Sequence, residues 1–232
     1  MTLRVVVRNA RMAFTRKRDA LIGLRPDIAV IPECGRVIEA TSYSSVWFGS
    51  IRNKGLAIFG FDTYQVSLEP GYDDSIKEVA PAWVVAGANR FFLLAVWSQR
   101  PYGEAIQRAL VTYRAQLTDG PPLWPVTSIQ ILCSTKVGWS AITVELFNSC
   151  TISACRALIT LRLGKPGIGD WDDALLEWTP GTRTIYHIDY CFLPKAWLGG
   201  LRSVSLGGRS DWGHLSDHIP LIVDVDIRSS SE

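Results

Sequence analysis

The first thirty residues run through apolar and polar positions in a strand–helix–strand order. Residues 3–8 are rich in valine and predict a β-strand. Residues 14–24 carry their apolar side chains on one face of a helix, and the Arg-Pro pair that follows ends it. Residues 28–32 are a second apolar run of strand length. This spacing predicts a crossover unit, in which a helix joins two strands of one sheet.

Strands predominate in the rest of the chain. Apolar runs bounded by turn residues predict strands at residues 46–48, 56–59, 82–86, 91–97, 184–193, 201–206 and 219–227. Residues 103–117 have the apolar spacing of an amphipathic helix. The pattern is weaker between residues 120 and 182, where 127–132 is compatible with a strand and 140–148 with a helix. Many strands with few helices predict two sheets packed face to face and flanked by helices.

Polar side chains stand where four of these predicted strands begin or end. Asn9 follows the first strand and Glu33 follows the second. Asp189 lies in a later strand, and Asp217 and His218 directly precede the last one. Burial of a charge beside an apolar strand costs several kcal/mol unless the charge is paired. Such residues usually serve chemistry, so we expect a functional site at the strand ends.

Composition narrows the class of protein. We predict a single domain over residues 1–232, and the net charge of +2 gives no broad basic field. The five cysteines are scattered without a CxxC pair, which favours reduced thiols in a cytoplasmic protein. The histidines lack the spacing of a zinc site, and His187 and His214 are expected at the surface or in turns. The most apolar stretch, residues 79–97, is interrupted by Pro, Gly, Asn and Arg and predicts a hairpin, not a membrane span.

Four short motifs in order resemble the endonuclease/exonuclease/phosphatase superfamily, which includes abasic-site endonucleases and DNase I-like nucleases. They are Arg8-Asn9 at a strand end, Pro32-Glu33 after Pro26-Asp27, Ile188-Asp189-Tyr190, and Ser216-Asp217-His218. The first pair is Trp-Asn in the family. The resemblance implies an α/β (α+β) fold, a four-layered sandwich of two packed mixed β-sheets flanked by helices, with its site at the strand ends.

The resemblance also implies roles for individual residues. Glu33 would bind Mg²⁺ or Mn²⁺, with Asn9 and Asp217 as further metal-site residues, because hard divalent ions prefer oxygen ligands. Asp217 would act near the attacking water, and His218 would bind or polarise the phosphate while Asp189 orients its ring. Each residue also has a simpler reading. Glu33 would then be an exposed strand-end carboxylate, Asn9 a turn former and His218 a satisfied buried histidine.

Besides Arg8 in place of tryptophan, two departures from the family pattern matter. Trp97-Ser98 ends the strand on which the family usually has a histidine. The family's Gly-Asp-x-Asn motif should follow the helix at 103–117 and a strand, but residues 125–130 carry no such motif. Gly169-Asp170 lies too close to the Ile-Asp-Tyr strand to replace it. We hypothesise that residues 120–182 are a drifted or frame-shifted version of the family segment.

Together these observations predict a divalent-metal-dependent phosphoesterase, a hydrolase of phosphodiesters of the nuclease kind, impaired by the absent motif. The expected partner is a phosphoester substrate, with nucleic acid among the candidates, and no membrane. The alternative is a catalytically inactive relative that binds phosphate ligands or a protein. Metal-dependent turnover separates the two readings.

Overall fold

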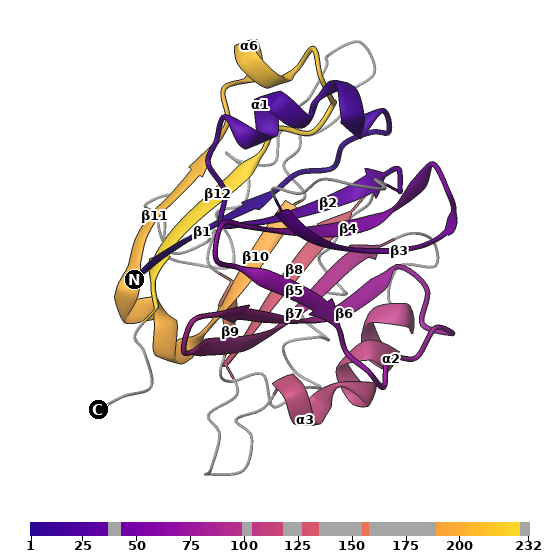
Figure 1. Ribbon diagram of the computed structural model, residues 1–232, viewed down its shortest axis with the longest axis vertical. Helices are drawn as coiled ribbons and strands as arrows, with labels where there is room; N and C mark the ends of the chain where they lie inside the picture. Colours follow the sequence, from indigo (N-terminus) through magenta and orange to yellow (C-terminus); the bar gives the residue numbers. More distant parts are fainter. Residues whose placement is uncertain (37–42, 99–103, 118–126, 135–154, 158–188, 228–232) are drawn as a thin grey trace, which may run out of the picture.

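Two six-stranded β-sheets form the centre of the computed structural model of the chain (Figure 1). The structure describes residues 1–36, 43–98, 104–117, 127–134, 155–157 and 189–227. Each sheet contains one parallel pair of strands and is otherwise antiparallel, so both sheets are mixed. The predicted mixed sheets are confirmed.

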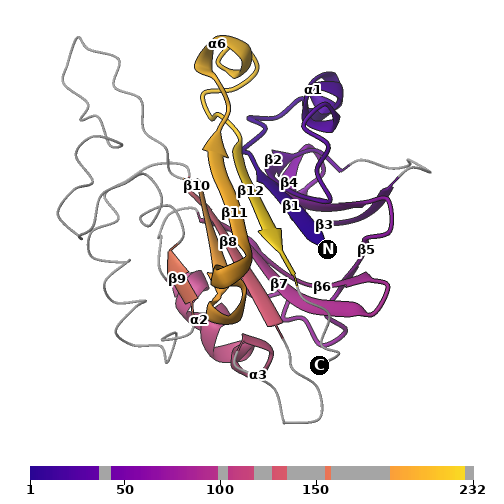
Figure 2. The same ribbon diagram turned by 90° about the vertical axis from the view of Figure 1, so that its left-hand side faces the viewer.

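The first sheet has the strand order β11-β12-β1-β2-β4-β3. Its strands are β1 (Thr2–Val7), β2 (Ile28–Cys34), β3 (Tyr43–Ile51), β4 (Lys54–Phe61), β11 (Leu201–Leu206) and β12 (Leu221–Asp226). The pair β1 and β2 is parallel, as the predicted crossover unit requires. The last strand of the chain, β12, lies beside the first, and Figure 2 shows it with β11 along the near side of the molecule.

The second sheet has the order β5-β6-β7-β8-β10-β9. Its strands are β5 (Gln65–Leu68), β6 (Val79–Ala86), β7 (Asn89–Ser98), β8 (Thr127–Ser134), β9 (Cys155–Ala157) and β10 (Asp189–Pro194). The predicted hairpin is β6 and β7, and β8 pairs parallel to β7. The short strands β5 and β9 were not predicted, because three or four residues give little period to detect.

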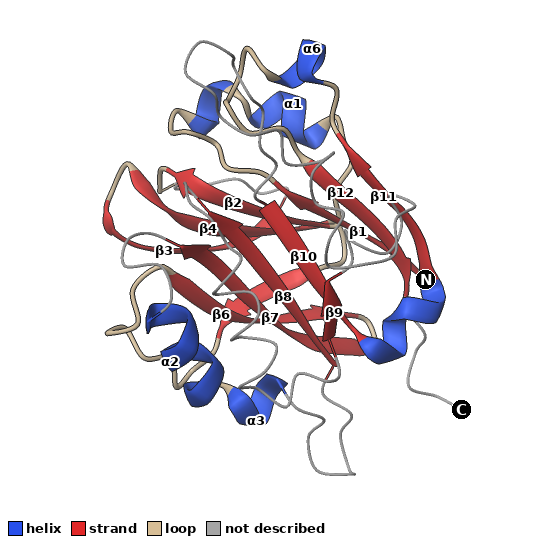
Figure 3. Ribbon diagram, turned by 180° about the vertical axis from the view of Figure 1, so that it is seen from behind, coloured by secondary structure: helices blue, strands red, loops and turns tan. Residues whose placement is uncertain are grey.

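Helical segments flank both sheets (Figure 3). They are η1 (Phe14–Arg16), α1 (Arg18–Ile22), α2 (Glu104–Thr112), α3 (Arg114–Leu117), η3 (Lys195–Gly200) and α6 (Arg209–Trp212). The prediction of one helix over 14–24 was wrong. The segment divides at Lys17, whose φ of −116° is outside the helical range. The helix predicted over 103–117 is likewise divided, between α2 and α3.

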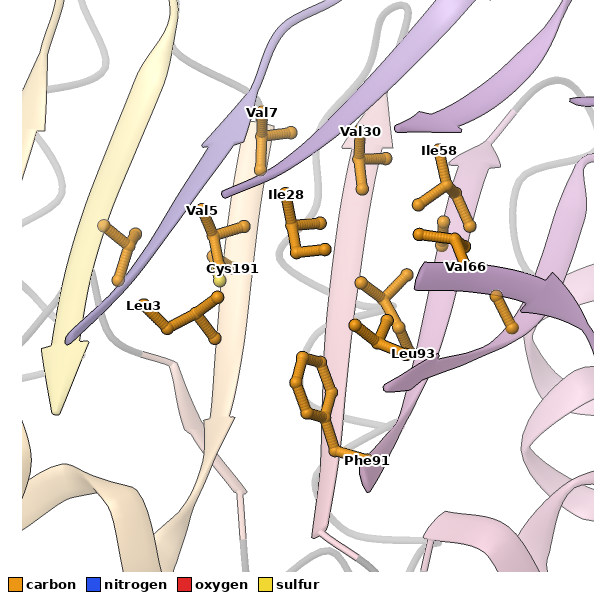
Figure 4. Close-up of a cluster of buried hydrophobic side chains, with 14 of the residues drawn as sticks. Leu3, Val5, Val7, Ile28, Val30, Ile58, Val66, Phe91, Leu93 and Cys191 are labelled. Atoms are coloured by element: carbon orange, nitrogen blue, oxygen red, sulfur yellow. The ribbon is translucent and has the colours of Figure 1, made fainter. Parts of the chain in front are cut away.

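Three separate apolar layers hold these elements together, and strand alternation assigns each side chain to one of them. Between the sheets, residues from β1, β2 and β4 face residues from β7 and β10, as Figure 4 shows for Val5, Ile28 and Phe91. On the outer face of the first sheet, Phe14 and Leu21 pack against the alternate side chains of its strands. On the outer face of the second sheet, α2 packs against alternate residues of β7. Three apolar layers make a sandwich of four layers, which confirms the predicted fold class.

Some sequence-based expectations fall on residues outside the described ranges. These are the helix at 140–148, the Gly-Asp loop around residue 170 and the first part of the strand predicted over 184–193. Among the helices that the structure describes, none has the length and apolar character needed to cross a membrane.

Candidate active site at the strand ends

The polar residues predicted from the sequence meet at one edge of the sandwich. In the first sheet, Val7 at the end of β1 pairs with Val30 of β2 and with Leu221 at the start of β12. In the second sheet, the end of β7 and the end of β8 adjoin Asp189 at the start of β10. The segments that carry Asn9, Glu33 and His218 therefore lie at the same end of the sandwich as Asp189. A contact between His218 and Asp189 joins the two sheets there.

Asn9 is buried and connects the ends of the two parallel strands. Its side-chain Nδ2 donates a hydrogen bond to Glu33 Oε1 at 3.2 Å. Its Oδ1 accepts a hydrogen bond from the backbone N–H of Arg11 at 2.8 Å, the geometry of an Asx turn. The turn-forming reading of Asn9 is therefore correct, but the same side chain also holds the carboxylate of Glu33.

Glu33 occupies an unusual backbone position. Its φ is +53°, and the register of β2 with β4 shifts between Pro32 and Cys34, which makes Glu33 the extra residue of a β-bulge. The Trp47 indole N–H donates to the carbonyl of Cys34 at 2.9 Å and fixes the strand just past the bulge. A non-glycine residue in the left-handed region costs about 1–3 kcal/mol, and such strain is concentrated at functional sites.

The loop after Asn9 is strained in the same way. Arg11, Met12 and Ala13 all have positive φ, at 49°, 63° and 50°. Three contacts hold this conformation: the turn made by Asn9, a backbone hydrogen bond from Met12 to the carbonyl of Glu33 at 3.0 Å, and the Lys17 ammonium on the carbonyl of Ala10. The two strained segments thus support each other beside the site.

Ser216 attaches the loop before β12 to the end of β1. Its buried hydroxyl donates to the carbonyl of Asn9 at 2.9 Å and accepts a hydrogen bond from the backbone N–H of His218 at 3.2 Å. The sequence analysis read Ser216 only as part of a motif. The signal that could have identified it is a small hydroxyl residue two positions before the candidate histidine.

His218 and Asp189 form the closest side-chain pair of the site. Nδ1 of His218 lies 2.9 Å from Asp189 Oδ2; the side chain of Asp189 is buried and that of His218 is 11% exposed. Burial by itself lowers the pKa of His218, but the charge and hydrogen bond of Asp189, with smaller contributions from Asp217 and Glu33, raise it above its ordinary value. The predicted orientation of the histidine by Asp189 has the geometry it requires.

Asp217 differs from its neighbours because it is exposed. Its carboxylate lies 3.9 Å from the Arg11 guanidinium, in a pair whose partners are both more than half exposed. Asp217 lies in the loop before β12. Nearby, burial and the charges of Arg8 and Arg11 lower the pKa of Lys17, against the attraction of Asp217 and Glu33. Cations therefore surround the carboxylates at this edge.

Arg8 is the site residue that the sequence analysis missed. Its side chain is only 3% exposed, and its guanidinium lies 4.5 Å from the ring centre of Trp212 in α6. Burial lowers its pKa to about 10, an effect that the charge of Asp189 opposes. An arginine that ends an apolar strand, where the resembling family has tryptophan, was the available signal.

Among the side chains at these strand ends, the carboxylate of Glu33 is the group that suits a divalent cation. Within the part of the chain that the structure describes, no three His, Cys, Asp or Glu residues are grouped as a complete metal site. Glu33 accepts a hydrogen bond through Oε1, and among the described residues its other carboxylate oxygen receives none. Mg²⁺ commonly binds through one or two carboxylates and keeps several waters, so Glu33 suits this type of site.

The position at which the family has a histidine has a different arrangement here. Trp97 is buried between the sheets, and the Lys54 ammonium lies 5.1 Å from its ring centre. The residues that follow β8, where the Gly-Asp-x-Asn motif is expected, lie outside the described ranges. The Lys54 ammonium therefore lies against Trp97 here, and the described residues include no substitute for the missing motif.

Comparison with known proteins finds similarity in structure only. No protein-family model matches the chain, and no curated protein matches its sequence. The endonuclease domain of TRAS1, a telomere-specific non-LTR retrotransposon, superposes with a TM-score of 0.62 at 15% identity, over 97% of this chain and 99% of that one. The 3′ phosphatase NExo from Neisseria, bound to a product DNA hairpin, gives 0.65 at 13% identity, over 97% and 100%.

A third similar structure is the endonuclease/exonuclease/phosphatase from Bacteroides vulgatus, with a TM-score of 0.65 at 13% identity, over 98% of this chain and 100% of that one. All three matches extend over nearly the whole of both chains, so the likeness concerns the complete four-layered arrangement. The chain therefore has the DNase I-like fold of the endonuclease/exonuclease/phosphatase superfamily, as its ordered motifs predicted.

Proposed function

We propose that this protein is a divalent-metal-dependent phosphoesterase that hydrolyses phosphodiesters in the manner of a nuclease. The observation that carries the proposal is the His218–Asp189 pair, whose 2.9 Å contact lies at the same strand ends as the Glu33–Asn9 pair. A phosphate-contacting histidine and a metal-binding carboxylate are the two parts that such hydrolysis needs most.

The metal site would be formed by Glu33, with Asn9 and Asp217 beside it. Bound Mg²⁺ or Mn²⁺ would offset charge on the phosphoryl oxygens and favour ionisation of a water. Asn9 holds one oxygen of Glu33 through its amide, which leaves the other oxygen for the cation. The bulge at Glu33 turns this carboxylate out of the regular strand, so the strained backbone has a use.

His218 is positioned for contact with a phosphate. Because Asp189 holds Nδ1, the second ring nitrogen, Nε2, is the one left for substrate. The raised pKa of His218 favours its protonated form, which binds an anionic oxygen better than neutral imidazole does. Asp217 is exposed at the same loop, where it would accept a proton from the attacking water.

The proteins of similar structure support a phosphoester substrate, with nucleic acid as the first candidate. The NExo phosphatase is seen with a product DNA hairpin, and the zebrafish (D. rerio) TDP2 structure holds a single-stranded DNA product. In this chain, Arg11 and Lys17 place positive charge near the carboxylates of the site. A phosphate backbone is a suitable partner for such a group of charges.

The second candidate function is a phosphate-binding relative without catalysis. The absence of Gly-Asp-x-Asn after the helix at 103–117 favours it, since loss of residues that act as a unit costs orders of magnitude in rate. This candidate keeps the same cations and the same His218–Asp189 pair, and it predicts binding of phosphate without turnover.

Hydrolysis assays distinguish the two candidates. Plasmid DNA, an abasic duplex, RNA and a chromogenic phosphodiester would be tested with Mg²⁺, Mn²⁺ and a chelator. Phosphoesterase activity should depend on the metal and fall by about 10²- to 10⁴-fold in Glu33→Gln and His218→Ala. His214→Ala is the matched control, because His214 is exposed in the same loop region. Turnover that survives both site variants, or no turnover from a folded protein, would contradict the proposal.

A further inference from the structure

A second contact between the two sheets lies at the same strand ends as the contact of His218 with Asp189. The Lys54 ammonium, at the start of β4 in the first sheet, lies 5.1 Å from the ring centre of Trp97, near the end of β7 in the second. This distance is typical of a cation–π contact. Trp97 stands where the resembling family usually has a histidine, so the contact brings a cation to that position.

The strand register places Lys54 next to the candidate metal site. The pairing of β4 with β2 sets Gly55 opposite Cys34, and Lys54 and Glu33 are the residues directly before these two. Glu33 is held on its other side by the amide of Asn9, from the end of β1. The carboxylate that suits a divalent cation therefore has Asn9 toward β1 and Lys54 toward β4.

The Lys54 ammonium is a donor without an acceptor. Its side chain is half-buried, and within the described part of the chain the ammonium has no ion pair or hydrogen bond. Trp97 is 4% exposed, and its indole N–H also has no hydrogen-bond partner among the described residues. An aromatic ring attracts an ammonium but supplies no oxygen to accept its three N–H donors. The ring holds the cation while its hydrogen bonds are left for an anion.

This contact lies too far from His218 to serve the same phosphate. In the first sheet, the strand order places Glu33 of β2 between the loop of His218, before β12, and Lys54 of β4. In the second sheet, β8 lies between Trp97 and Asp189 and pairs with both. Neighbouring strands are about 4.8 Å apart, so the backbones at Trp97 and Asp189 are about 10 Å apart. A phosphate at His218 therefore leaves Lys54 for another anionic group.

We propose that Lys54, held on the face of Trp97, binds a second phosphate of the substrate, next to the phosphate that is hydrolysed. The substrate class is then a nucleic-acid strand. The two phosphates of a diphosphate share an oxygen and lie closer together than the two contacts do, whereas a sugar separates the phosphates of a strand. The identity of the first phosphate, at Glu33 and His218, rests on the proposed function.

The competing idea is that Lys54 only covers the tryptophan, with its stem on the ring and its ammonium in water. The other end of β7 offers a contact of that kind. Cζ of Arg90 lies 4.0 Å from the ring centre of Trp83, which packs on the outer face of the second sheet. There the indole N–H donates to Glu69, so the tryptophan has an acceptor within the fold. Arg90 is therefore the matched control for Lys54.

The test is binding of a short fluorescein-labelled thymidine strand, followed by fluorescence anisotropy in a chelator at pH about 6 over a range of salt concentrations. Each phosphate neutralised on a single strand contributes about 0.7 to the slope of log K against log salt. Lys54→Met should weaken binding at low salt by about tenfold, as expected for one hydrogen bond to a charged group, and reduce the slope by about 0.7. Lys54→Arg should keep both values, and Arg90→Met should leave them unchanged.

A double variant separates one bound phosphate from two. If Lys54 and His218 bind different phosphates, the slope losses of Lys54→Met and His218→Ala should add to about 1.4. A double variant that loses no more than one single variant would overturn the proposal. So would equal slopes in Lys54→Met and Arg90→Met, or no binding of the strand by wild-type protein. Binding in a chelator requires no turnover, so absence of hydrolysis alone would refute the proposed function and not this inference.

Discussion

Arg4 in β1 and Arg8, one residue past the end of that strand, are in opposite situations. Arg4 is 39% exposed and donates two hydrogen bonds to Asp224, at 2.7 and 3.0 Å, and a third to the carbonyl of Leu24. Arg8, four residues later, is 3% exposed and has two guanidinium nitrogens without a partner among the described residues. The first arrangement serves stability. The second costs stability, so we infer that it is kept for the chemistry of the site.

Backbone strain is concentrated where β1 ends, where residues 11–13 and Glu33 all have positive φ. Near the start of β1, the strands are joined by surface pairs such as Thr2 with Asp226 at 2.7 Å, but Arg25, in the turn before β2, also has positive φ. The strained residues at both places lie in turns or at a bulge, so the strain does not come from the regular ladder of the sheet.

The largest expected effect comes from Asp189→Asn, which removes the charge behind His218 with little change of shape. Because His218 would lose its oriented partner, we expect phosphodiester turnover to fall by about 10²- to 10⁴-fold. Steady-state kinetics of the metal-loaded enzyme measure this fall. Asp224→Asn, in β12 opposite Arg4, is the control and should keep its turnover. Equal losses of turnover in Asp189→Asn and Asp224→Asn would show that the candidate site and the Arg4–Asp224 pair do not differ in their importance for catalysis.

Arg4→Met tests the Arg4–Asp224 ion pair, which we expect to stabilise the fold. Loss of a partly exposed pair should lower the free energy of unfolding by about 1 kcal/mol and leave turnover unchanged. Urea denaturation followed by circular dichroism measures the first quantity. A large loss of activity without a loss of stability would mean that Arg4 also reaches the site.

Ala13→Gly tests the strain in the loop. Glycine adopts positive φ without steric cost, so the free energy of unfolding should rise by about 0.5–1 kcal/mol after the entropic cost is subtracted. Ala20→Gly, in α1, is the matched control and should lower it by about 1 kcal/mol, since glycine is unfavourable inside helices. The difference in sign between the two variants is the prediction, and two losses would show that the loop is not strained.

Acid should weaken the ion pairs and hydrogen bonds that Asp224 and Asp226 form near the start of β1. The hydrogen bond from Arg4 lowers the pKa of Asp224, and those from Arg202 and Thr2 lower the pKa of Asp226 to about 2. A carboxyl with a lowered pKa stabilises the fold above its unfolded pKa of about 4, and this contribution is lost as pH falls through its folded value. The stability difference between wild type and Asp224→Asn should hold above pH about 4 and shrink below it. A difference that grows on acidification would contradict the assignment.

Much of the fold was predictable because strand alternation is a local property. Val5 and Val6 face different layers, as any strand at this point requires, and the crossover order of β1 and β2 follows from spacing. The undivided helix over 14–24 failed for a reason that periodicity does not contain. Lys17 adopts a non-helical φ while its ammonium bonds the carbonyl of Ala10. That contact depends on the loop beyond Asn9, not on the helix.

The residues of the site were predicted from motifs, but their contacts were not. His218, in the loop before β12 of the first sheet, and Asp189, in β10 of the second, are 29 residues apart, so only the family resemblance suggested that they meet. The bulge at Glu33 depends on Trp47 and on the partner strand, which no local pattern reports. Arg8 was noted as a departure from the family, and its burial against Trp212 became visible only in three dimensions.

The central claim is that this strand edge binds a divalent metal and a phosphate together. The most direct measurement is a crystal structure of the protein grown with Mn²⁺ and inorganic phosphate, with anomalous diffraction to locate the metal. We predict manganese on a carboxylate oxygen of Glu33, and a phosphate that contacts both the metal and the His218 ring. Manganese and phosphate bound elsewhere, with the edge between Glu33 and His218 empty, would contradict the account.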